Sequence, residues 1–486
     1  MEQTATKPSL KLNYKRTALI GFAFFGILLL WQVYDSWCPT FLTDIFARNM
    51  YNLTSAELKA DPAKNLEVQW LVGIIMACDN LAALILLPIF GRLSDKAKTP
   101  IGKRMPFILI GTFVAAIAFP FIPLFFHFNN IIGMVIMMAI VLMFMMMYRN
   151  PAVSLMPDMT PKPLRAKANG IINIMGYFGG AFATVLGMIL VLSNYINLTD
   201  RSQSLWIIEL PFIIASLLMV ISAGVLFFTI KENKIAEEVR GEMEEGEKLA
   251  AIENPVEEDK PLTKANKIML WGILIAEFLW FMADNAIGTY LGNYVIYYME
   301  AKSSNTGTLT IVGGVASVIG FAIAGFIADK IGRKWTISAG LALTFIALFI
   351  MIFVFPKTDA ADKVLDKASG LYYSPLPVML FIIWALKGFG MALVHNCSFP
   401  MVVELSTGKT VGKFTSFYYT ASMSAQTITP ILLGLIFKVT LAWHALPIYA
   451  TSLILVSGLV FTIIVKNIKS NKEKNVKGLE ALGADD

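Results

Sequence analysis

Six ionisable side chains lie within long apolar stretches of this chain. They are Asp35, Asp79, Arg149, Glu277, Asp284 and Lys387. A charge in the hydrocarbon of a membrane costs roughly 3 kcal/mol or more, so each of these groups is expected to face a cavity or a partner. Four acids stand against two bases, and burial and mutual repulsion both favour the neutral form of a carboxylic acid. At least one acid is therefore expected to bind and release a proton near neutral pH.

The stretches that carry these groups are predicted to be membrane-spanning helices. Of the 486 residues 56% are hydrophobic and 15% are charged, and the mean hydropathy is +0.65, which excludes an ordinary soluble domain. About 20 residues cross the hydrocarbon, and twelve stretches are long enough. They cover residues 17–43, 68–90, 105–126, 130–155, 167–192, 204–230, 268–298, 307–328, 335–355, 376–402, 414–437 and 444–466.

The ionisable groups recur on every third predicted helix. Asp79 is on the second helix, and the other five are on the first, fourth, seventh and tenth. In transporters built from three-helix repeats, the binding site lies at the interface between the repeats, near the middle of the membrane. The pattern predicts an all-α membrane protein of twelve transmembrane helices in two pseudo-symmetric six-helix bundles.

The two halves also share weak sequence repeats. Trp31 and Asp35 on the first helix have the same spacing as Trp280 and Asp284 on the seventh, and the segments GRLSDKAKTPIGKRMPF and GFIADKIGRKW correspond. The only long polar segment between helices separates the halves. We predict an N-terminal bundle at residues 1–230, a cytoplasmic linker at 231–267 that is partly helical near 237–249, a C-terminal bundle at 268–468 and a cytoplasmic tail at 469–486.

The basic residues set the predicted orientation. Most of the 40 lysines and arginines lie at the N-terminus, in the tail and in the loops that follow even-numbered helices. Because cytoplasmic loops are enriched in these residues, both termini are expected in the cytoplasm. The protein is predicted to lie in the plasma membrane, or in the inner membrane of a bacterium. The net charge of +6 follows from this topology and does not indicate nucleic-acid binding.

Two segments resemble a known transporter family. One is Pro88-x-x-Gly91-x-x-Ser94-Asp95 followed by Gly102-Lys103-Arg104-x-Pro106-Phe107-Ile108, and the other runs from Arg149-Asn150-Pro151 through Asp158 and Arg165 to Ala168-Asn169-Gly170. Both resemble the glycoside–pentoside–hexuronide:cation symporters, in the branch of plant sucrose transporters and animal proton–sugar symporters. The resemblance spans residues 15–468. It implies the major facilitator fold and cation-coupled uptake of a glycoside.

The sequence departs from this family at its sodium site. In the melibiose-carrier type, the second helix carries two carboxylates that help to bind sodium, and an Asp precedes the proline of the fourth helix. The matching positions here are Ala83, Leu87 and Arg149. A hard cation needs several oxygen ligands, and a guanidinium would repel it. Protons are therefore the predicted coupling ion.

Helical spacing places aromatic rings beside carboxylates and amides. The apolar face of a sugar ring stacks on such rings, and its hydroxyls bond to polar groups. Packing against lipid or between helices is the competing interpretation for the aromatic and amide groups, and a static ion pair is the competing interpretation for the charges. The predicted substrate-binding residues are Trp31, Tyr34, Asp35, Arg149, Asn173, Trp280, Asp284, Lys387 and Gln426. The predicted proton-coupling residues are Asp79, Asp35 and Glu277.

Further charges flank the cytoplasmic ends of the predicted helices. Such groups suit ion pairs that hold an inner gate and break during alternating access. The predicted gating residues are Asp95, Arg104, Asp158, Arg165, Asp329, Arg333 and Glu404.

The predicted function is proton-coupled import of a disaccharide such as sucrose or maltose by a monomer in the lipid bilayer. The alternatives are a proton-driven exporter of amphipathic compounds and a non-transporting sugar sensor with the same fold. Neither a catalytic centre, a cofactor nor a metal is expected, because three cysteines and three histidines are too few and no phosphate-binding loop is present. The sequence leaves the sugar and the stoichiometry open.

Overall fold

The computed structural model describes residues 10–53, 57, 62–191, 208–253, 263–356, 359, 362–367, 371–405 and 411–466. Within them, twelve helices are long and apolar enough to cross a membrane, as the sequence predicts. The protein is therefore a multi-pass membrane protein of the predicted all-α class. The predicted tail at 469–486 lies outside the described residues.

Six spans form the N-terminal bundle. The third is divided at Phe119 and Pro120, where Pro120 supplies no backbone N–H. The helices are α1 Tyr14–Tyr51, α4 Gln69–Lys96, α5 Met105–Ala118 with α6 Phe121–His127, α7 Ile131–Asp158, α8 Arg165–Ile189 and α10 Leu210–Thr229.

Six further spans form the C-terminal bundle, and a π-helical turn ends the first of them. They are α13 Lys264–Asn293 with η3 Tyr294–Tyr298, α14 Ser304–Ile331, α15 Arg333–Met351, α16 Val378–Glu404, α17 Val411–Thr440 and α18 Ala445–Ile464. Each bundle has its own buried apolar core, one built on α1 to α10 and the other on α13 to α18.

Side-chain caps fix the start of several helices. Asn13 accepts a hydrogen bond of 3.0 Å from the backbone N–H of Arg16 at the start of α1, and Asn130 accepts one of 2.9 Å from Gly133 at the start of α7. Thr263 caps α13 in the same way, so that α13 begins at Lys264, inside the segment predicted as linker.

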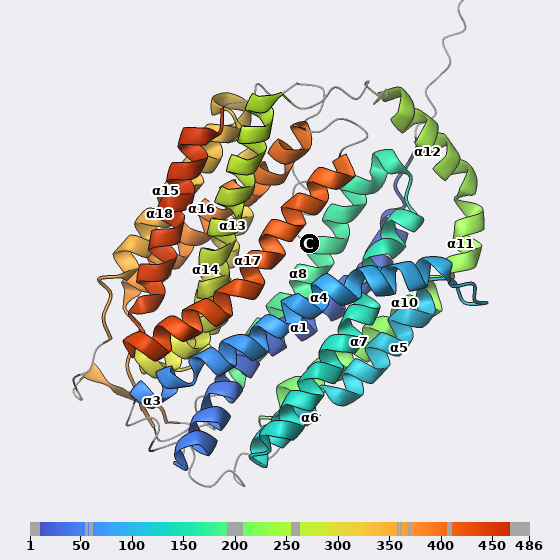
Figure 1. Ribbon diagram of the computed structural model, residues 1–486. Coiled ribbons are helices and arrows are strands. Elements are labelled where there is room, and N and C mark those ends of the chain that lie inside the picture. Colours follow the sequence, from blue (N-terminus) through green and yellow to red (C-terminus); the bar gives the residue numbers. More distant parts are fainter. Residues whose placement is uncertain are drawn as a thin grey trace, which may run out of the picture.

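Short elements mark the two ends of the molecule. On the end where α1 begins, the linker forms α11 Glu232–Glu238 and α12 Arg240–Glu253, and η1 Lys162–Leu164 joins α7 to α8. On the opposite end, α3 Pro62–Glu67 precedes α4, and the strands β1 Val364–Leu365 and β2 Tyr372–Tyr373 pair antiparallel. We call these ends the linker side and the hairpin side (Figure 1).

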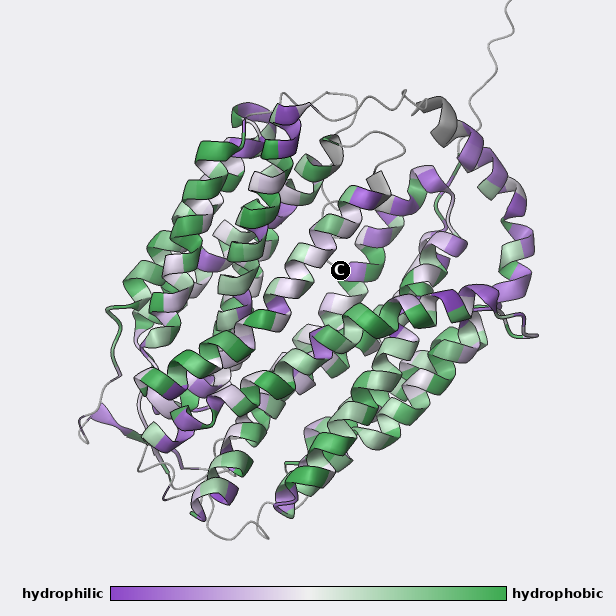
Figure 2. Ribbon diagram, in the orientation of Figure 1, coloured by the Kyte–Doolittle hydropathy of each residue, from purple (hydrophilic) through white to green (hydrophobic). Residues whose placement is uncertain are grey.

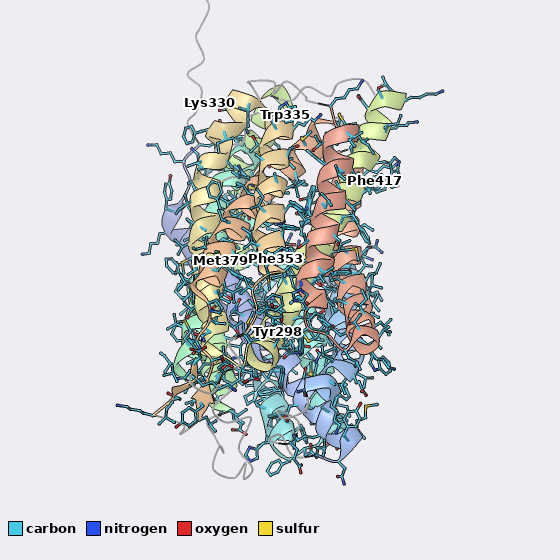
Figure 3. All side chains as sticks on the ribbon, turned by 90° about the vertical axis from the view of Figure 1, so that its left-hand side faces the viewer. Tyr298, Lys330, Trp335, Phe353, Met379 and Phe417 are labelled. Atoms are coloured by element: carbon cyan, nitrogen blue, oxygen red, sulfur yellow. The ribbon has the colours of Figure 1, made fainter. Side chains whose placement is uncertain are left out.

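The helices present apolar residues outward, as a membrane requires. Figure 2 shows apolar colouring along the outer helices and polar colouring over α11 and α12. Phe353, Met379 and Phe417 are exposed on the C-terminal bundle. In Figure 3, Lys330 and Trp335 lie near the linker side and Tyr298 lies toward the hairpin side.

Candidate functional site

A cavity of about 640 Å³ lies between the two bundles. Its walls come from α1, α4 and α7 of the N-terminal bundle and from α13, α14, α16 and α17 of the C-terminal bundle. The first helix of each predicted three-helix unit therefore contributes to it. Six of the predicted substrate-binding or proton-coupling residues line it. They are Trp31, Asp35, Asp79, Arg149, Lys387 and Gln426.

The N-terminal wall combines two carboxylates with one guanidinium. Asp35 is exposed to the cavity, whereas Asp79 is only 8% exposed. The Asp79 carboxylate accepts a hydrogen bond of 2.6 Å from the backbone N–H of Asn80, and the charges of Asp35 and Arg149 both act on it. Arg149 forms no hydrogen bond or ion pair within the described part of the chain. Its guanidinium therefore has donors left for a substrate.

The C-terminal wall is built around an ion pair between Lys387 of α16 and Asp284 of α13. The ammonium lines the cavity, and the carboxylate lies behind it. Because Asp284 neutralises Lys387, this wall keeps no net charge from the pair. Tyr419 and Trp384 add aromatic surface beside it.

Besides Asp284, the structure places four further predicted site residues behind the wall. Tyr34 is fully buried and contacts the Trp31 ring edge-on at 5.8 Å between centroids. Trp280 is fully buried and packs against Phe461 at 6.3 Å. Successive residues of a helix point about 100° apart, so a stripe that includes Tyr34 and Asp35 cannot face the cavity along its whole width.

The remaining two buried residues are polar. Asn173 is 2% exposed in the N-terminal bundle, and Glu277 is fully buried in the C-terminal bundle. Neither is among the residues that line the cavity. Their predicted roles would therefore require them to act through other groups.

Several wall residues were outside the predicted site. Asn285 follows Asp284 and lines the cavity, and its side-chain oxygen makes no hydrogen bond within the described residues. Gly313 and Gly314 of α14 also line it, and the backbone of Gly313 packs closely against Gly388 of α16. A pair of glycines within an apolar helix is a sequence signal of such close approach.

Hydrogen bonds between the bundles close the cavity toward the hairpin side. The Asn293 amide donates to Thr43 Oγ1 at 2.8 Å and to Gln69 Oε1 at 3.3 Å, and it accepts from Thr40 Oγ1 at 3.1 Å. All four side chains are at most 1% exposed. One amide of α13 thus binds both α1 and α4, and Figure 1 shows the bundles diverging away from this point toward the linker side.

Close packing of α4 on α17 completes this closure. The Tyr290 hydroxyl donates to the backbone oxygen of Pro430 at 2.6 Å and lies 3.3 Å from that of Gln69. Gly73 allows this approach, because a Cβ there would come within 2.9 Å of the Tyr290 hydroxyl and overlap the carbonyl of Pro430. These contacts between the bundles are made by neutral groups, and the Lys438 ammonium of α17 adds a charged contact 4.6 Å from the centroid of the Trp70 ring of α4.

The linker side of the N-terminal bundle carries a cluster of charges around Arg104. The guanidinium, 5% exposed, donates to Asp158 at 2.9 Å and to Ser94 Oγ at 2.5 Å and pairs with Asp95, while Lys103 lies 3.0 Å from Asp158. Burial alone lowers the pKa of Arg104, but the hydrogen bonds and charges of Asp158 and Asp95 outweigh it and raise that pKa. All these pairs lie within one bundle.

The other predicted gating residues differ in their contacts and in their exposure. Arg165 donates to the backbone oxygens of Thr160 and Pro157 at 3.0 and 2.9 Å, so it braces the turn after α7; burial lowers the pKa of its guanidinium. Asp329 is exposed and Arg333 is half-buried. The side chain of Glu404 lies outside the described residues.

The sequence profile of the Major Facilitator Superfamily matches residues 20–362 and 273–483. The chain belongs to this superfamily. Membership of this superfamily points to a transporter of small molecules across a membrane rather than to an enzyme. No curated protein sequence matches this superfamily member significantly.

Solved structures of major facilitator transporters share the fold. The xylose transporter XylE from E. coli in an inward-open conformation has a TM-score of 0.61 and 15% identity, covering 96% of this chain and 98% of its own. A bacterial homologue of the iron transporter ferroportin, in an inward-facing state, has a TM-score of 0.60 and 14% identity, and the match covers 93% of this chain and 98% of that one. The nucleoside transporter NupG has a TM-score of 0.60 and 10% identity, and the match covers 93% of this chain and 100% of that one. At these identities, the likeness concerns the fold.

Proposed function

We propose that this chain is a proton-coupled symporter that imports a glycoside, a disaccharide of the sucrose or maltose type, by alternating access. The proposal places it in the glycoside–pentoside–hexuronide:cation symporter branch of the superfamily. One observation carries it: carboxylates, cations and aromatic rings from both bundles meet around one cavity of about 640 Å³. Small-molecule sites span roughly 300–1,000 Å³.

The aromatic and amide groups support a sugar as the substrate. Trp31 and Trp384 line the cavity from opposite bundles, and the apolar face of a pyranose stacks on such rings. Arg149, Asn285 and Gln426 offer donors and acceptors for hydroxyl groups. A substrate held by both bundles would sense their relative movement.

The N-terminal wall supports protons as the coupling ion. Asp35 and Asp79 are the carboxylates there, and each would carry or release a proton as its surroundings change. Ala83 presents a methyl group to the cavity, where sodium would need an oxygen, and the cation Arg149 lies on the same wall. We assign the coupled proton to Asp79 or Asp35.

Orientation and gating complete the proposal. The linker side faces the cytoplasm of the plasma membrane or bacterial inner membrane, because basic residues concentrate there, and the structure then corresponds to an inward-facing state. The transporter works as a monomer. The charges of the linker side, those of Asp95, Arg104, Asp158, Arg165, Asp329, Arg333 and Glu404, control the inner gate.

Uptake by proteoliposomes tests the function. Purified protein is reconstituted, and radiolabelled mono- and disaccharides are offered with an imposed pH gradient or with a sodium gradient at constant pH. We expect a disaccharide to accumulate with the pH gradient alone. Accumulation with sodium alone would refute proton coupling. Sugar binding without uptake would identify a sensor, and proton-driven expulsion of amphipathic dyes without sugar uptake would identify an exporter.

A further inference from the structure

The first residue of the linker helix α11 is a buried acid. Glu232 is 4% exposed, although it follows the polar Lys231 and lies in a segment rich in exposed charges. A buried carboxylate is costly unless hydrogen bonds satisfy it. The structure shows which donors do so.

Glu232 accepts hydrogen bonds from three successive backbone N–H groups at the start of α5. Lys103 donates at 2.9 Å, Arg104 at 3.0 and 3.1 Å to the two oxygens, and Met105 at 3.0 Å. The next residue, Pro106, has no N–H. The carboxylate therefore takes the place of a helix cap and also meets the positive end of the helix dipole.

Neighbouring contacts bind the same two segments together. Asn233 donates to the backbone oxygens of Thr99 and Pro100 at 3.1 and 3.0 Å. Gly102 has a φ of 120° and lies against the Glu232 side chain, where a Cβ would overlap the carboxylate. The loop between α4 and α5 is thus shaped around the linker.

The linker helices contact a second turn of the same bundle. Gly246 of α12 packs against Pro161, and Lys162 lies 3.8 Å from Glu247. Pro161 follows α7, whose last residue is Asp158. The linker therefore touches the segments that carry both partners of the Arg104–Asp158 pair.

We propose that Glu232 is the positioning residue of the linker-side charge cluster. By holding the N–H groups of residues 103–105, it fixes the backbone from which the Arg104 side chain reaches Asp95 and Asp158. The linker then acts as a brace of the N-terminal bundle. The proposal rests on the proposed alternating access only where it concerns the gate.

Hydrogen exchange tests the positioning directly. Full-length protein in nanodiscs is compared as wild type, Glu232→Ala, Glu232→Gln and Glu238→Ala, the last removing an exposed acid of the same helix. In Glu232→Ala, amides in the peptide 97–107 should exchange about tenfold faster or more, as the loss of one charge-assisted hydrogen bond implies. Glu232→Gln keeps one acceptor and should lie between the wild type and Ala. Unchanged exchange in both Glu232 variants would overturn the proposal.

A double-mutant cycle tests whether Glu232 acts through Arg104. A single cysteine at Met423, which lines the cavity, is labelled from the linker side after the native cysteines are replaced by alanine. In the background that keeps Arg104, Glu232→Ala should change the labelling rate of this cysteine. In the Arg104→Gln background, Glu232→Ala should leave that rate unchanged. Equal effects in both backgrounds would refute positioning. Since neither readout needs sugar uptake, failure of the proposed function would appear separately, in the proteoliposomes.

Discussion

The Asn293 side chain donates a hydrogen bond of 2.8 Å to Thr43 Oγ1, and both residues are fully buried where the two bundles meet. This bond belongs to a set of neutral contacts on the hairpin side. The charged cluster of the N-terminal bundle lies on the opposite side. Opening toward the hairpin side must therefore break hydrogen bonds between buried amides and hydroxyls, whose strength depends little on salt.

Replacing Asn293 by Ala should open the hairpin side. Thr40, Thr43 and Gln69 would each lose a partner in a buried place, and an unsatisfied buried polar group costs about 1–3 kcal/mol. A cysteine at Ser36, which lines the cavity, should react at least about tenfold faster with a reagent added on the hairpin side. Asn49→Ala is the matched control, because Asn49 is exposed and bonds Asn129 on the same side. Equal labelling in both variants would contradict a gating role.

Replacing Gly73 by Ala should also open the hairpin side, but through a steric clash. The added Cβ would overlap the Pro430 carbonyl and press on the Tyr290 hydroxyl, so α4 and α17 would have to separate. Overpacking of this kind costs about 1–3 kcal/mol. Gly224→Ala is the control, because no atom lies within 4 Å of a Cβ there. The melting temperatures of the two variants should differ, and so should the labelling rates of a cysteine at Ser36. Equal values in both variants would show that the α4–α17 contact does not hold the hairpin side closed.

The sequence predicted the twelve spans and five of the helices that line the cavity, because a charge in an apolar stretch has few tolerable surroundings. The helix α14, which also lines the cavity, carries none of these charges and was not indicated by them. The sequence was less able to predict which of two neighbouring residues on one helix faces the cavity. Asp35 reaches the cavity and Tyr34 does not, although both belong to the same predicted stripe. The tilt and rotation of a helix decide this, and they depend on packing against other helices.

Contacts between distant segments were beyond prediction. Nothing in the polar linker distinguishes Glu232 from its acidic neighbours, since its role depends on where α5 begins in space. Asn293 likewise stands in an ordinary apolar context. Its importance arises because α1 and α4 bring Thr43 and Gln69 to it.

The Lys387–Asp284 pair gives a prediction on stability. The two side chains are 17% and 32% exposed, so the cost of Asp284→Asn should lie between the roughly 1 kcal/mol of a surface pair and the roughly 3 kcal/mol of a buried one. The melting temperature should fall, and it should recover when Lys387→Met is added. Glu244→Gln, in the exposed pair with Arg240 at 3.4 Å, should change it little. No recovery in the double variant would show that the two charges are not coupled.

Asp158→Asn should favour the inward-open state. Asp158 is the shared partner of Arg104 and Lys103 within the N-terminal bundle, so its loss leaves the linker-side ends of α5 and α7 less firmly joined and should let that side open further. A cysteine at Met423 should become more accessible from the cytoplasmic side. Raising the salt concentration should change the difference between the variant and the wild type only a little, since the Arg104 side chain is 5% exposed and buried or partly buried pairs are screened weakly. Normal transport with unchanged accessibility would reduce Asp158 to a surface charge.

Asp35→Asn and Asp79→Asn should identify the carrier of the coupled proton. A neutral Asn resembles the protonated acid but has no proton to release. At the carrier, the change should abolish accumulation driven by a pH gradient while sugar exchange remains measurable. At an acid that binds sugar, it should instead remove binding, because a charge-assisted hydrogen bond worth roughly 1.5–3 kcal/mol is lost. Asp79, 8% exposed beside Arg149, fits the first role, and the exposed Asp35 fits the second. If both variants concentrate sugar as the wild type does, neither acid is the carrier, and Glu277 is the next to test.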